Sequence, residues 1–314
     1  MQRILVTGGA GFIGSWLVKN LLESGHEILV YDSLERGKPE FLPDSANLRF
    51  VKGDILDEKM LSAVFEGFQP QIVIHLAAMH FIPDCVAKPR LALRINAEGA
   101  QAILDECKRS CVKKVIIASS AAVYPIRELP HKESEPINAS EVYDNVYSVT
   151  KVVNERLLDE FSKRYADKVC IGLRIFNAFG PHETNPHLIP DIISELKNGD
   201  IIRLGNTESE RDYVYVEDLA DAIAKLAINY SQLGFDVFNI GAGQGHSAVD
   251  IVKAIAQLTG RPLRIEHVET KKRKIDRKFL IADISKIREA TGWQPKTSFE
   301  EGLSRLLKYE GLVK

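Results

Sequence analysis

Short apolar runs alternate with longer amphipathic stretches along this chain. The runs are rich in β-branched and aliphatic residues, which is typical of buried parallel strands, and they cover residues 4–6, 27–31, 48–51, 71–76, 114–118 and 169–173. Apolar residues recur at helical spacing in the intervening segments 16–24, 58–65, 90–110 and 147–165. Strands that alternate with helices in this way predict an α/β fold with a doubly wound parallel sheet.

The remainder of the chain has a less regular pattern. Charged and apolar residues alternate over residues 211–216, as in a half-exposed strand. The run 238–241 is interpreted as a strand that returns to the main sheet. The other elements predicted here are helices over residues 190–197, 216–229 and 247–259 and a strand over 201–204.

A glycine-rich turn directly follows the first apolar run. Gly8, Gly11 and Gly14 lie between that run and a helical pattern that includes Trp16. The first turn of such a helix has unpaired N–H groups and the positive end of the helix dipole, so it fits a pyrophosphate. Three glycines alone would be weak evidence, but a strand, glycines and a helix in this order predict a dinucleotide site.

An acidic residue completes this pattern. Asp32 ends the second run, about twenty residues beyond the glycines, where a carboxylate holds the ribose hydroxyls of a dinucleotide. The same carboxylate would repel a 2′-phosphate, so the sequence favours NAD over NADP. Arg36 is the one nearby charge that would soften this preference, and its alternative interpretation is a solvated loop arginine.

Other residues at strand ends are candidates for the rim of the same site. Asp54 follows the third run and is a candidate for the adenine amino group, for the N-cap of the next helix, or for both. Ala77 and Ala78 are small enough to let the backbone approach a flat cofactor. His80 lies at the mouth of the predicted site, either as a ligand contact or as a structural histidine.

Tyr147 and Lys151 are the candidate catalytic pair. They are four residues apart in a predicted helix, so their side chains leave from one helical face. An ammonium beside the phenol would lower its pKa from the usual value of about 10 and let it exchange a proton at neutral pH. Such pairs also occur on solvated faces, but this pair follows a dinucleotide fold and the strand-end serines Ser119 and Ser120.

Composition narrows the possible partners. The 314 residues are 45% apolar and carry a formal net charge of −2, which predicts a globular protein without a strong attraction to nucleic acid or anionic membranes. The four cysteines lack metal-site spacing, and no apolar run reaches the roughly twenty residues of a membrane helix. The N-terminus leads directly into a strand, without a signal sequence, so a cytoplasmic protein without a metal is expected.

One basic cluster lies near the C-terminus, at residues 271–274 and 277–278. The nearly neutral overall charge and the absence of interleaved aromatic residues argue against a nucleic-acid surface. Arg211 and Arg273 are instead candidates to bind a second pyrophosphate, which predicts a nucleotide-activated substrate.

Together these motifs resemble the extended short-chain dehydrogenase/reductases, and within them the nucleotide-sugar epimerase/dehydratase branch. The matching residues are 7–14, 54–55, 76–78, 119–120, 174–177 and 211–213, with Tyr147 and Lys151. The resemblance implies a Rossmann domain over residues 1–176, to which 212–246 return in part. It also implies a smaller, discontinuous α/β substrate domain over 177–211 and 247–314, bound NAD, a nucleotide-sugar substrate and a homodimer.

The resemblance further implies roles for individual residues. Tyr147 would be the acid/base at the sugar hydroxyl, Ser120 its hydrogen-bonding partner, and Lys151 a contact of the nicotinamide ribose. The implied cofactor-binding residues are Gly8, Gly11, Phe12, Ile13, Gly14, Asp32, Asp54, Ile55, Leu76, Ala77, Ala78, Asn96, Tyr147 and Lys151. The implied substrate-binding residues are His80, Ser120, Asn177, His187, Arg211, Arg273 and Asp276.

One departure from the family pattern narrows the chemistry. Related dehydratases and decarboxylating enzymes have one or two acidic residues after the catalytic serine or threonine, whereas this chain has Ala121 and Ala122. Elimination is therefore not expected. The predicted reaction is NAD-dependent epimerisation of a nucleotide sugar, foremost a UDP-sugar at C4, through a transient 4-keto-sugar.

A second departure leaves an alternative open. His187 lies where the GDP-fucose synthase group has a histidine acid, which would suit a 4-keto-sugar reductase or dehydrogenase. That group has a cysteine at the position of Ala122 and prefers NADP, so we interpret His187 as a substrate contact. A protein that binds NAD without catalysis is disfavoured because Ser120, Tyr147 and Lys151 are all present.

Overall fold

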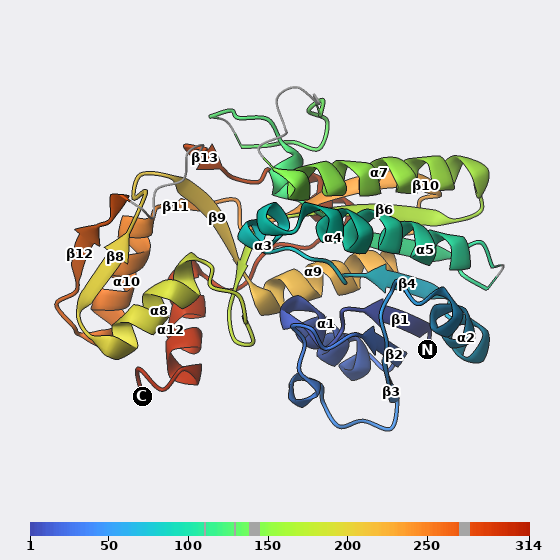
Figure 1. Ribbon diagram of the computed structural model, residues 1–314, viewed down its shortest axis with the longest axis horizontal. Coiled ribbons are helices and arrows are strands. Elements are labelled where there is room, and N and C mark those ends of the chain that lie inside the picture. Colours follow the sequence, from blue (N-terminus) through green and yellow to red (C-terminus); the bar gives the residue numbers. More distant parts are fainter. Residues whose placement is uncertain (110, 129, 138–144, 270–276) are drawn as a thin grey trace.

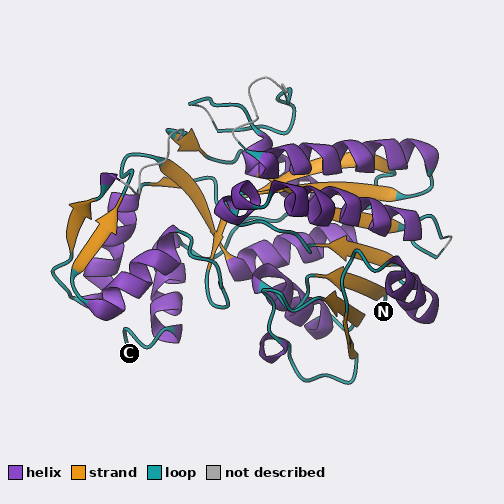
Figure 2. Cartoon of the chain, viewed as in Figure 1, coloured by secondary structure: helices purple, strands orange, loops and turns teal. Residues whose placement is uncertain are grey.

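A computed structural model describes residues 1–109, 111–128, 130–137, 145–269 and 277–314 of the chain. Figure 1 shows two parts of unequal size. The larger part contains the N-terminus and a long sheet between layers of helices, and the smaller part contains the C-terminus, short strands and helices (Figures 1 and 2).

Seven parallel strands form the main sheet, in the order β10-β6-β5-β4-β1-β2-β3. β10 pairs with β6, which confirms that the chain returns to this sheet after leaving it. The strands are β1 (Arg3–Thr7), β2 (Glu27–Asp32), β3 (Leu48–Lys52), β4 (Ile72–His75), β5 (Lys114–Ser120), β6 (Val169–Ile175) and β10 (Gly234–Ile240).

Both faces of the main sheet are buried, as its apolar strands predict. Ile4 and Val6 pack with α1 and α9 on one face, whereas Leu5, between them, packs with α2, α5 and α7 on the other. This two-sided burial confirms the doubly wound sheet. The helices and helical turns of this part are α1 (Phe12–Glu23), η1 (Pro39–Phe41), α2 (Glu58–Phe68), α3 (Ile82–Ala87), α4 (Pro89–Leu93), η2 (Arg94–Glu98), α5 (Gly99–Glu106), η3 (Ala121–Val123), α7 (Val146–Arg164), α9 (Val216–Asn229) and α11 (Ser285–Thr291).

The smaller part has its own apolar core. In one sheet β9 lies between β11 and β13 and also pairs with β7, and in a second sheet β8 pairs with β12. Ile192, Ile251 and Leu303 belong to the core that joins α8, α10 and α12 to these strands. The residue boundaries between the two domains stay a prediction. The elements are β7 (Asn177–Phe179), α8 (Leu188–Asn198), β8 (Ile201–Leu204), β9 (Glu210–Tyr215), β11 (Gly245–His246), α10 (Ala248–Thr259), β12 (Arg264–His267), β13 (Phe279–Leu280) and α12 (Phe299–Tyr309).

One local prediction in the larger part is confirmed and another was wrong. The segment predicted as a helix over 90–110 is helical through α4, η2 and α5, although η2 is a π-helical turn that the pattern did not predict. Asp54 does not cap α2: the N-cap is Asp57, whose carboxylate accepts the N–H of Met60. Asp54 instead accepts the N–H of Leu56 and thereby forms a tight turn before the helix.

The strand predicted as half-exposed, β9, is largely buried. Its Asp212 is fully buried, and its carboxylate accepts three backbone N–H groups, from Ala242, Gly243 and Ala282. Burial raises the pKa of Asp212 to about 6, against the opposing effect of these hydrogen bonds. The alternation of charged and apolar residues predicted exposure wrongly, because the Asp212 carboxylate binds the backbone of neighbouring loops instead of facing water.

His182 forms a strained corner between the two parts. Its φ of 76° lies in the left-handed region, which is uncommon for a residue other than glycine. Its imidazole stacks on the ring of Phe41, with centroids 4.0 Å apart, and lies 5.2 Å from the ring of Trp16. The edge of Tyr309 from α12 contacts the same imidazole at 5.9 Å. One side chain thus joins α1, η1 and α12.

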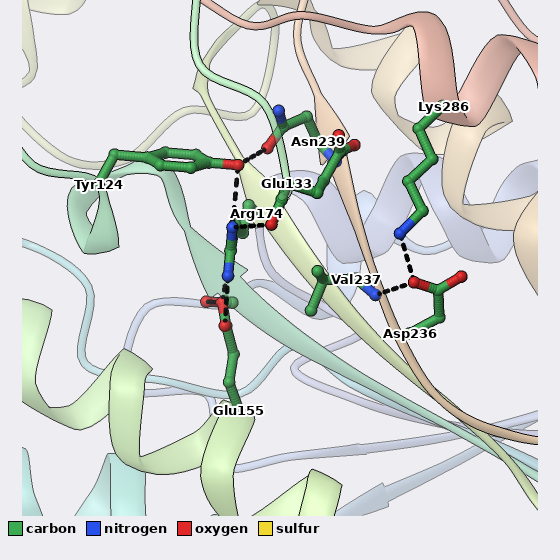
Figure 3. Close-up of polar contacts among 9 residues, drawn as sticks. Tyr124, Glu133, Glu155, Arg174, Asp236, Val237, Asn239 and Lys286 are labelled. Atoms are coloured by element: carbon green, nitrogen blue, oxygen red, sulfur yellow. Dashed lines mark hydrogen bonds and ion pairs between the residues drawn. The ribbon is translucent and has the colours of Figure 1, made fainter. Parts of the chain in front are cut away.

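A buried ion pair fixes α7 against the sheet (Figure 3). Arg174 of β6 binds both carboxylate oxygens of Glu155 on α7, at 2.8 and 2.9 Å, and the two side chains are only 4% and 7% exposed. Ser119 of β5 donates a third hydrogen bond to the same carboxylate at 2.6 Å. Arg174 also donates to the Tyr124 hydroxyl, which in turn donates to Asn239. The network therefore connects β5, β6, α7 and β10.

Replacement of Glu155 by Gln is expected to lower the free energy of unfolding by about 3 kcal/mol or more, because the Arg174 guanidinium would stay buried without a charged partner. Urea denaturation measures this loss. Glu160→Gln, on the exposed side of the same helix, is the matched control and should leave the free energy of unfolding nearly unchanged. Equal effects of the two substitutions would contradict the assignment.

Candidate active site

A cleft of about 1700 Å³ lies at the carboxyl ends of the main-sheet strands and continues between the two parts of the molecule. This is the edge at which doubly wound sheets bind their ligands. Its lining comes from both parts, with Gly8, Asp32 and Ala77 from the larger part and Asn177, His187 and Arg211 from the smaller part. The cleft lining includes all of the described site residues predicted from the sequence except Asn96.

The glycine turn is packed as closely as its residues allow. A Cβ atom on Gly14 would lie 2.2 Å from the carbonyl oxygen of Gly8, and one on Gly8 would lie 2.7 Å from the backbone of Ala77. α1 begins at this turn with Gly11 as its N-cap, without a capping side chain and without an acidic residue in its first turn. Its first N–H groups and positive dipole end therefore face the cleft, as a pyrophosphate requires.

Asp32 lies beside the glycine turn and is almost fully buried. Its carboxylate accepts the N–H groups of Ala10 and Leu34 at 3.0 and 2.8 Å, although burial raises its pKa. Asp54 and Ile55 line the same end of the cleft. The glycines, the uncapped helix and this carboxylate together fit the pyrophosphate and adenosine ribose of NAD.

Substitution of Gly14 by Ala is expected to abolish NAD binding, because the added methyl group cannot fit against Gly8 without opening the turn. The NAD content of the purified protein measures the effect. Gly67→Ala is the control, because a Cβ atom at that position of α2 would meet nothing within 4 Å. A Gly14→Ala variant that retains stoichiometric NAD would rule out the proposed cradle.

Tyr147 and Lys151 lie on one face of α7, as their spacing predicts, and both side chains are buried. The Lys151 ammonium lies 5.6 Å from the centre of the Tyr147 ring and donates to the carbonyl of Ala118 at 2.8 Å. Ser120 follows at the end of β5, and its hydroxyl accepts the N–H of Ala122. α7 and β5 therefore bring the three predicted catalytic residues to one place in the cleft.

The predicted direction of the Tyr147 pKa shift was wrong for the protein without ligands. Burial raises the pKa of Tyr147 to about 12, and a hydrogen bond with Ser120 opposes this increase. Burial also lowers the pKa of Lys151 to about 8. Helical spacing placed the two groups correctly but gave no measure of desolvation, which disfavours both charged forms.

The raised pKa gives a direct test. In cofactor-free protein the Tyr147 phenol should stay protonated through pH 10, and Ser120→Ala should raise its pKa further, because the hydrogen bond that favours ionisation is lost. NMR of protein labelled at the tyrosine Cζ carbon reports the ionisation. A Tyr147→Phe variant assigns the signal, and ionisation below pH 10 would contradict the dominant effect of burial.

Asn96 lies outside the cleft, in contrast to its predicted place at the cofactor. Its side chain is fully buried in the π-helical turn η2 and binds both the N–H and the carbonyl of Met79, at 2.7 and 2.9 Å. It also donates to Thr150 of α7, whose hydroxyl donates to the backbone carbonyl of Tyr147. Asn96 thus supports the loop after β4 and the start of α7, and its contact with the cofactor stays a prediction.

Two histidines of the cleft lining, His80 and His187, lie close together, with ring centroids 5.9 Å apart. Asn185 donates its amide to Nε2 of His80 at 2.9 Å, and Nδ1 of His187 lies 3.3 Å from a carboxylate oxygen of Glu183. Burial opposes ionisation of Glu183, but His187 holds the pKa of this carboxyl below its usual range. Sequence reasoning missed Glu183 and Asn185, because no motif marks the segment between β7 and α8.

Arg211 lines the cleft beside Arg277. The Arg211 guanidinium donates to the carbonyls of Glu210 and Arg277, and Arg277 donates to the carbonyls of Tyr124 and Ala122. These contacts hold two cations in one wall. Arg277 was not singled out as a site residue, and the predicted residues Arg273 and Asp276 lie outside the described residues.

Comparison with known proteins decides the family. The model of the NAD dependent epimerase/dehydratase family matches residues 4–241. The chain belongs to this family. As the family description states, NAD is its cofactor, in agreement with the residues of the glycine turn. The sheet confirms the predicted Rossmann-type α/β fold, and the family match confirms the predicted enzyme of the epimerase/dehydratase type.

Individual members of the family resemble the chain over nearly its whole length. A UDP-glucose 4-epimerase of Lactobacillus helveticus is 33% identical, over 94% of this chain and 92% of its own. The Thermotoga maritima UDP-glucose 4-epimerase with UDP-glucose has a TM-score of 0.85 and 32% identity, over 98% of both chains. A Bacillus anthracis dTDP-glucose 4,6-dehydratase with NAD has a TM-score of 0.87 and 27% identity, over 99% and 97%.

Among the described residues, no helix combines the length and apolar character needed to cross a membrane. The same residues hold no group of three or more His, Cys, Asp and Glu side chains arranged for a metal ion.

Proposed function

We propose that the protein is an NAD-dependent nucleotide-sugar epimerase that inverts C4 of a UDP-sugar. The observation that carries this proposal is the joint placement of Ser120, Tyr147 and Lys151 in the cleft that the glycine turn and Arg211 also line. The first three residues supply proton chemistry at a carbinol. The glycine turn would hold NAD, and the Arg211 guanidinium would bind the diphosphate of the substrate.

The chemistry that bound NAD supplies is reversible hydride transfer, from the carbinol carbon and back to either face of the resulting ketone. The protein residues move the proton. In the reacting complex Tyr147 has to be ionised, its own proton having passed to solvent, and its phenolate oxygen then accepts the sugar hydroxyl proton as the ketone forms and returns it when the alcohol is restored. Ser120 orients this phenol, and the Lys151 ammonium favours the phenolate within the buried site. Both directions use the same groups, so no external reductant is consumed.

The two residues after Ser120 help to distinguish an epimerase from a dehydratase. The overall fold does not distinguish them. Both an epimerase and a dehydratase have high structural similarity to this chain. Ala121 is buried in an apolar cluster with Tyr124 and Phe176, and Ala122 lines the cleft without a side chain that could exchange a proton. Elimination of water requires an additional acid or base next to the sugar. The two alanines therefore favour epimerisation.

A one-way 4-keto-sugar reductase or dehydrogenase, similar to the GDP-fucose synthase group, is the alternative. The contact between His187 and Glu183 favours it, because a carboxylate that orients an imidazole is a common arrangement for proton transfer. The absence of a cysteine at Ala122 and the carboxylate of Asp32 argue against it. The choice of UDP rests on the relatives, and the homodimer and cytoplasmic location stay predictions.

Purified protein is expected to interconvert a UDP-sugar and its C4 epimer without added cofactor. Tyr147→Phe should lower kcat about a thousandfold, because the proton acceptor is lost while the NAD cradle stays intact. Product formation by chromatography and NAD content after denaturation measure the two effects. Tyr165→Phe, at the C-terminal end of the same helix and outside the cleft lining, is the matched control.

The same assay distinguishes the alternative. Turnover that stops unless NADH or NADPH is supplied in stoichiometric amounts would replace the epimerase with the reductase. Full activity of the Tyr147→Phe variant would remove this tyrosine from the mechanism.

A further inference from the structure

Arg36 and Asp84 form an ion pair at the dinucleotide half of the cleft. Arg36 lies in the loop after β2, and Asp84 lies in α3, after β4. In the sheet, β1 separates β2 from β4, so the pair connects the segments on either side of the glycine turn. Nη2 of Arg36 lies 2.5 Å from Oδ2 of Asp84, and both residues line the cleft. Arg36 is thus engaged by a carboxylate, not merely solvated.

The Arg36 side of this ion pair is anchored to the glycine turn. The N–H of Lys38 donates to the carbonyl of Ala10 at 2.9 Å, and Ala10 donates to Asp32. Gly37, between Arg36 and Lys38 in the chain, packs so closely that a Cβ atom on it would lie 3.0 Å from the backbone of Ala10. The loop that carries Arg36 therefore has little freedom to move away from the turn.

The Asp84 side is anchored to the catalytic half of the site. Cys85, the next residue of α3, is fully buried in a cluster that includes Tyr147. Its thiol donates to the carbonyl of Met79 at 3.2 Å. The ion pair therefore joins two segments of the cleft lining that are each held in place. An ion pair between neighbouring residues of one helix would not make such a connection.

We propose that the Arg36–Asp84 ion pair is a clasp that retains NAD in the cleft. A dinucleotide held by the glycine turn and Asp32 lies in the groove whose two sides the clasp connects, so the cofactor has to break the pair to leave. The proposal depends on NAD as the cofactor, which the family establishes, and not on the identity of the sugar. It goes beyond the proposed function because it concerns cofactor release, not the conversion of the sugar.

The expected effect of the ion pair on the rate of NAD release follows from the exposed fractions of its two side chains. The side chains are 51% and 37% exposed, so the attraction is modest and is screened by salt. Loss of either charge should speed NAD release up to about fivefold at low ionic strength. The difference should vanish at high ionic strength, because the clasp of the wild-type protein is then weakened as well.

Release of radiolabelled NAD from the holoenzyme, chased with excess unlabelled NAD, measures the clasp. The variants are Arg36→Gln, Asp84→Asn and the charge exchange Arg36→Asp with Asp84→Arg. The matched control is Arg49→Gln, which removes an ion pair with Glu27 between β2 and β3, outside the cleft lining. Melting temperature at saturating NAD verifies that each variant is folded.

Both single variants should release NAD faster than wild type at low salt, and the charge exchange should restore slow release. Arg49→Gln should behave as wild type. Wild-type rates in both single variants would overturn the proposal. So would an equal acceleration by Arg49→Gln, or a charge exchange that releases NAD as fast as the single variants. None of these outcomes depends on sugar turnover, so a failure of the proposed epimerase activity is recognised separately.

Discussion

The ion pair between Glu155 and Arg174 determines where α7 lies against the sheet. Two buried charges are tolerated only while each satisfies the other, so their hydrogen bonds allow one arrangement of helix and strand. Lys151 lies one helical turn before Glu155, and Ser119, which binds the same carboxylate, precedes Ser120. The contact between Glu155 and Arg174 (Figure 3) thus determines the positions of the proposed catalytic residues, although it takes no part in the chemistry.

The same burial that positions the proposed catalytic groups also changes their acidity. Tyr147 and Lys151 are both held in their neutral forms more strongly than in water. Charges that develop in such a site interact strongly, because little water screens them. Burial keeps the Tyr147 phenol neutral in the resting protein, whereas the hydrogen bond from Ser120 favours its ionisation. Ionisation of Tyr147 therefore becomes favourable only as part of the reaction.

The sequence predicted those features that depend on local pattern. Apolar runs located the main-sheet strands, and glycine spacing with Asp32 located the dinucleotide site, because both signals lie within short stretches of chain. Features that depend on distant residues were missed. The role of Asp212 requires loops that follow β10 and β13, and the partner of Arg36 is 48 residues away. The buried place of Asn96 likewise follows from contacts with Met79 and Thr150, which helical periodicity does not encode.

The corner at His182 has a consequence for how the two parts of the molecule communicate. Trp16 belongs to the helix that starts at the glycine turn, Phe41 follows the loop of Asp32, and Tyr309 belongs to the last helix of the smaller part. Rotation of the smaller part would have to separate the His182 ring from the stacked rings of Trp16 and Phe41. The orientation of the smaller part is therefore coupled to the helix that begins at the glycine turn, through rings that lie outside the cleft lining.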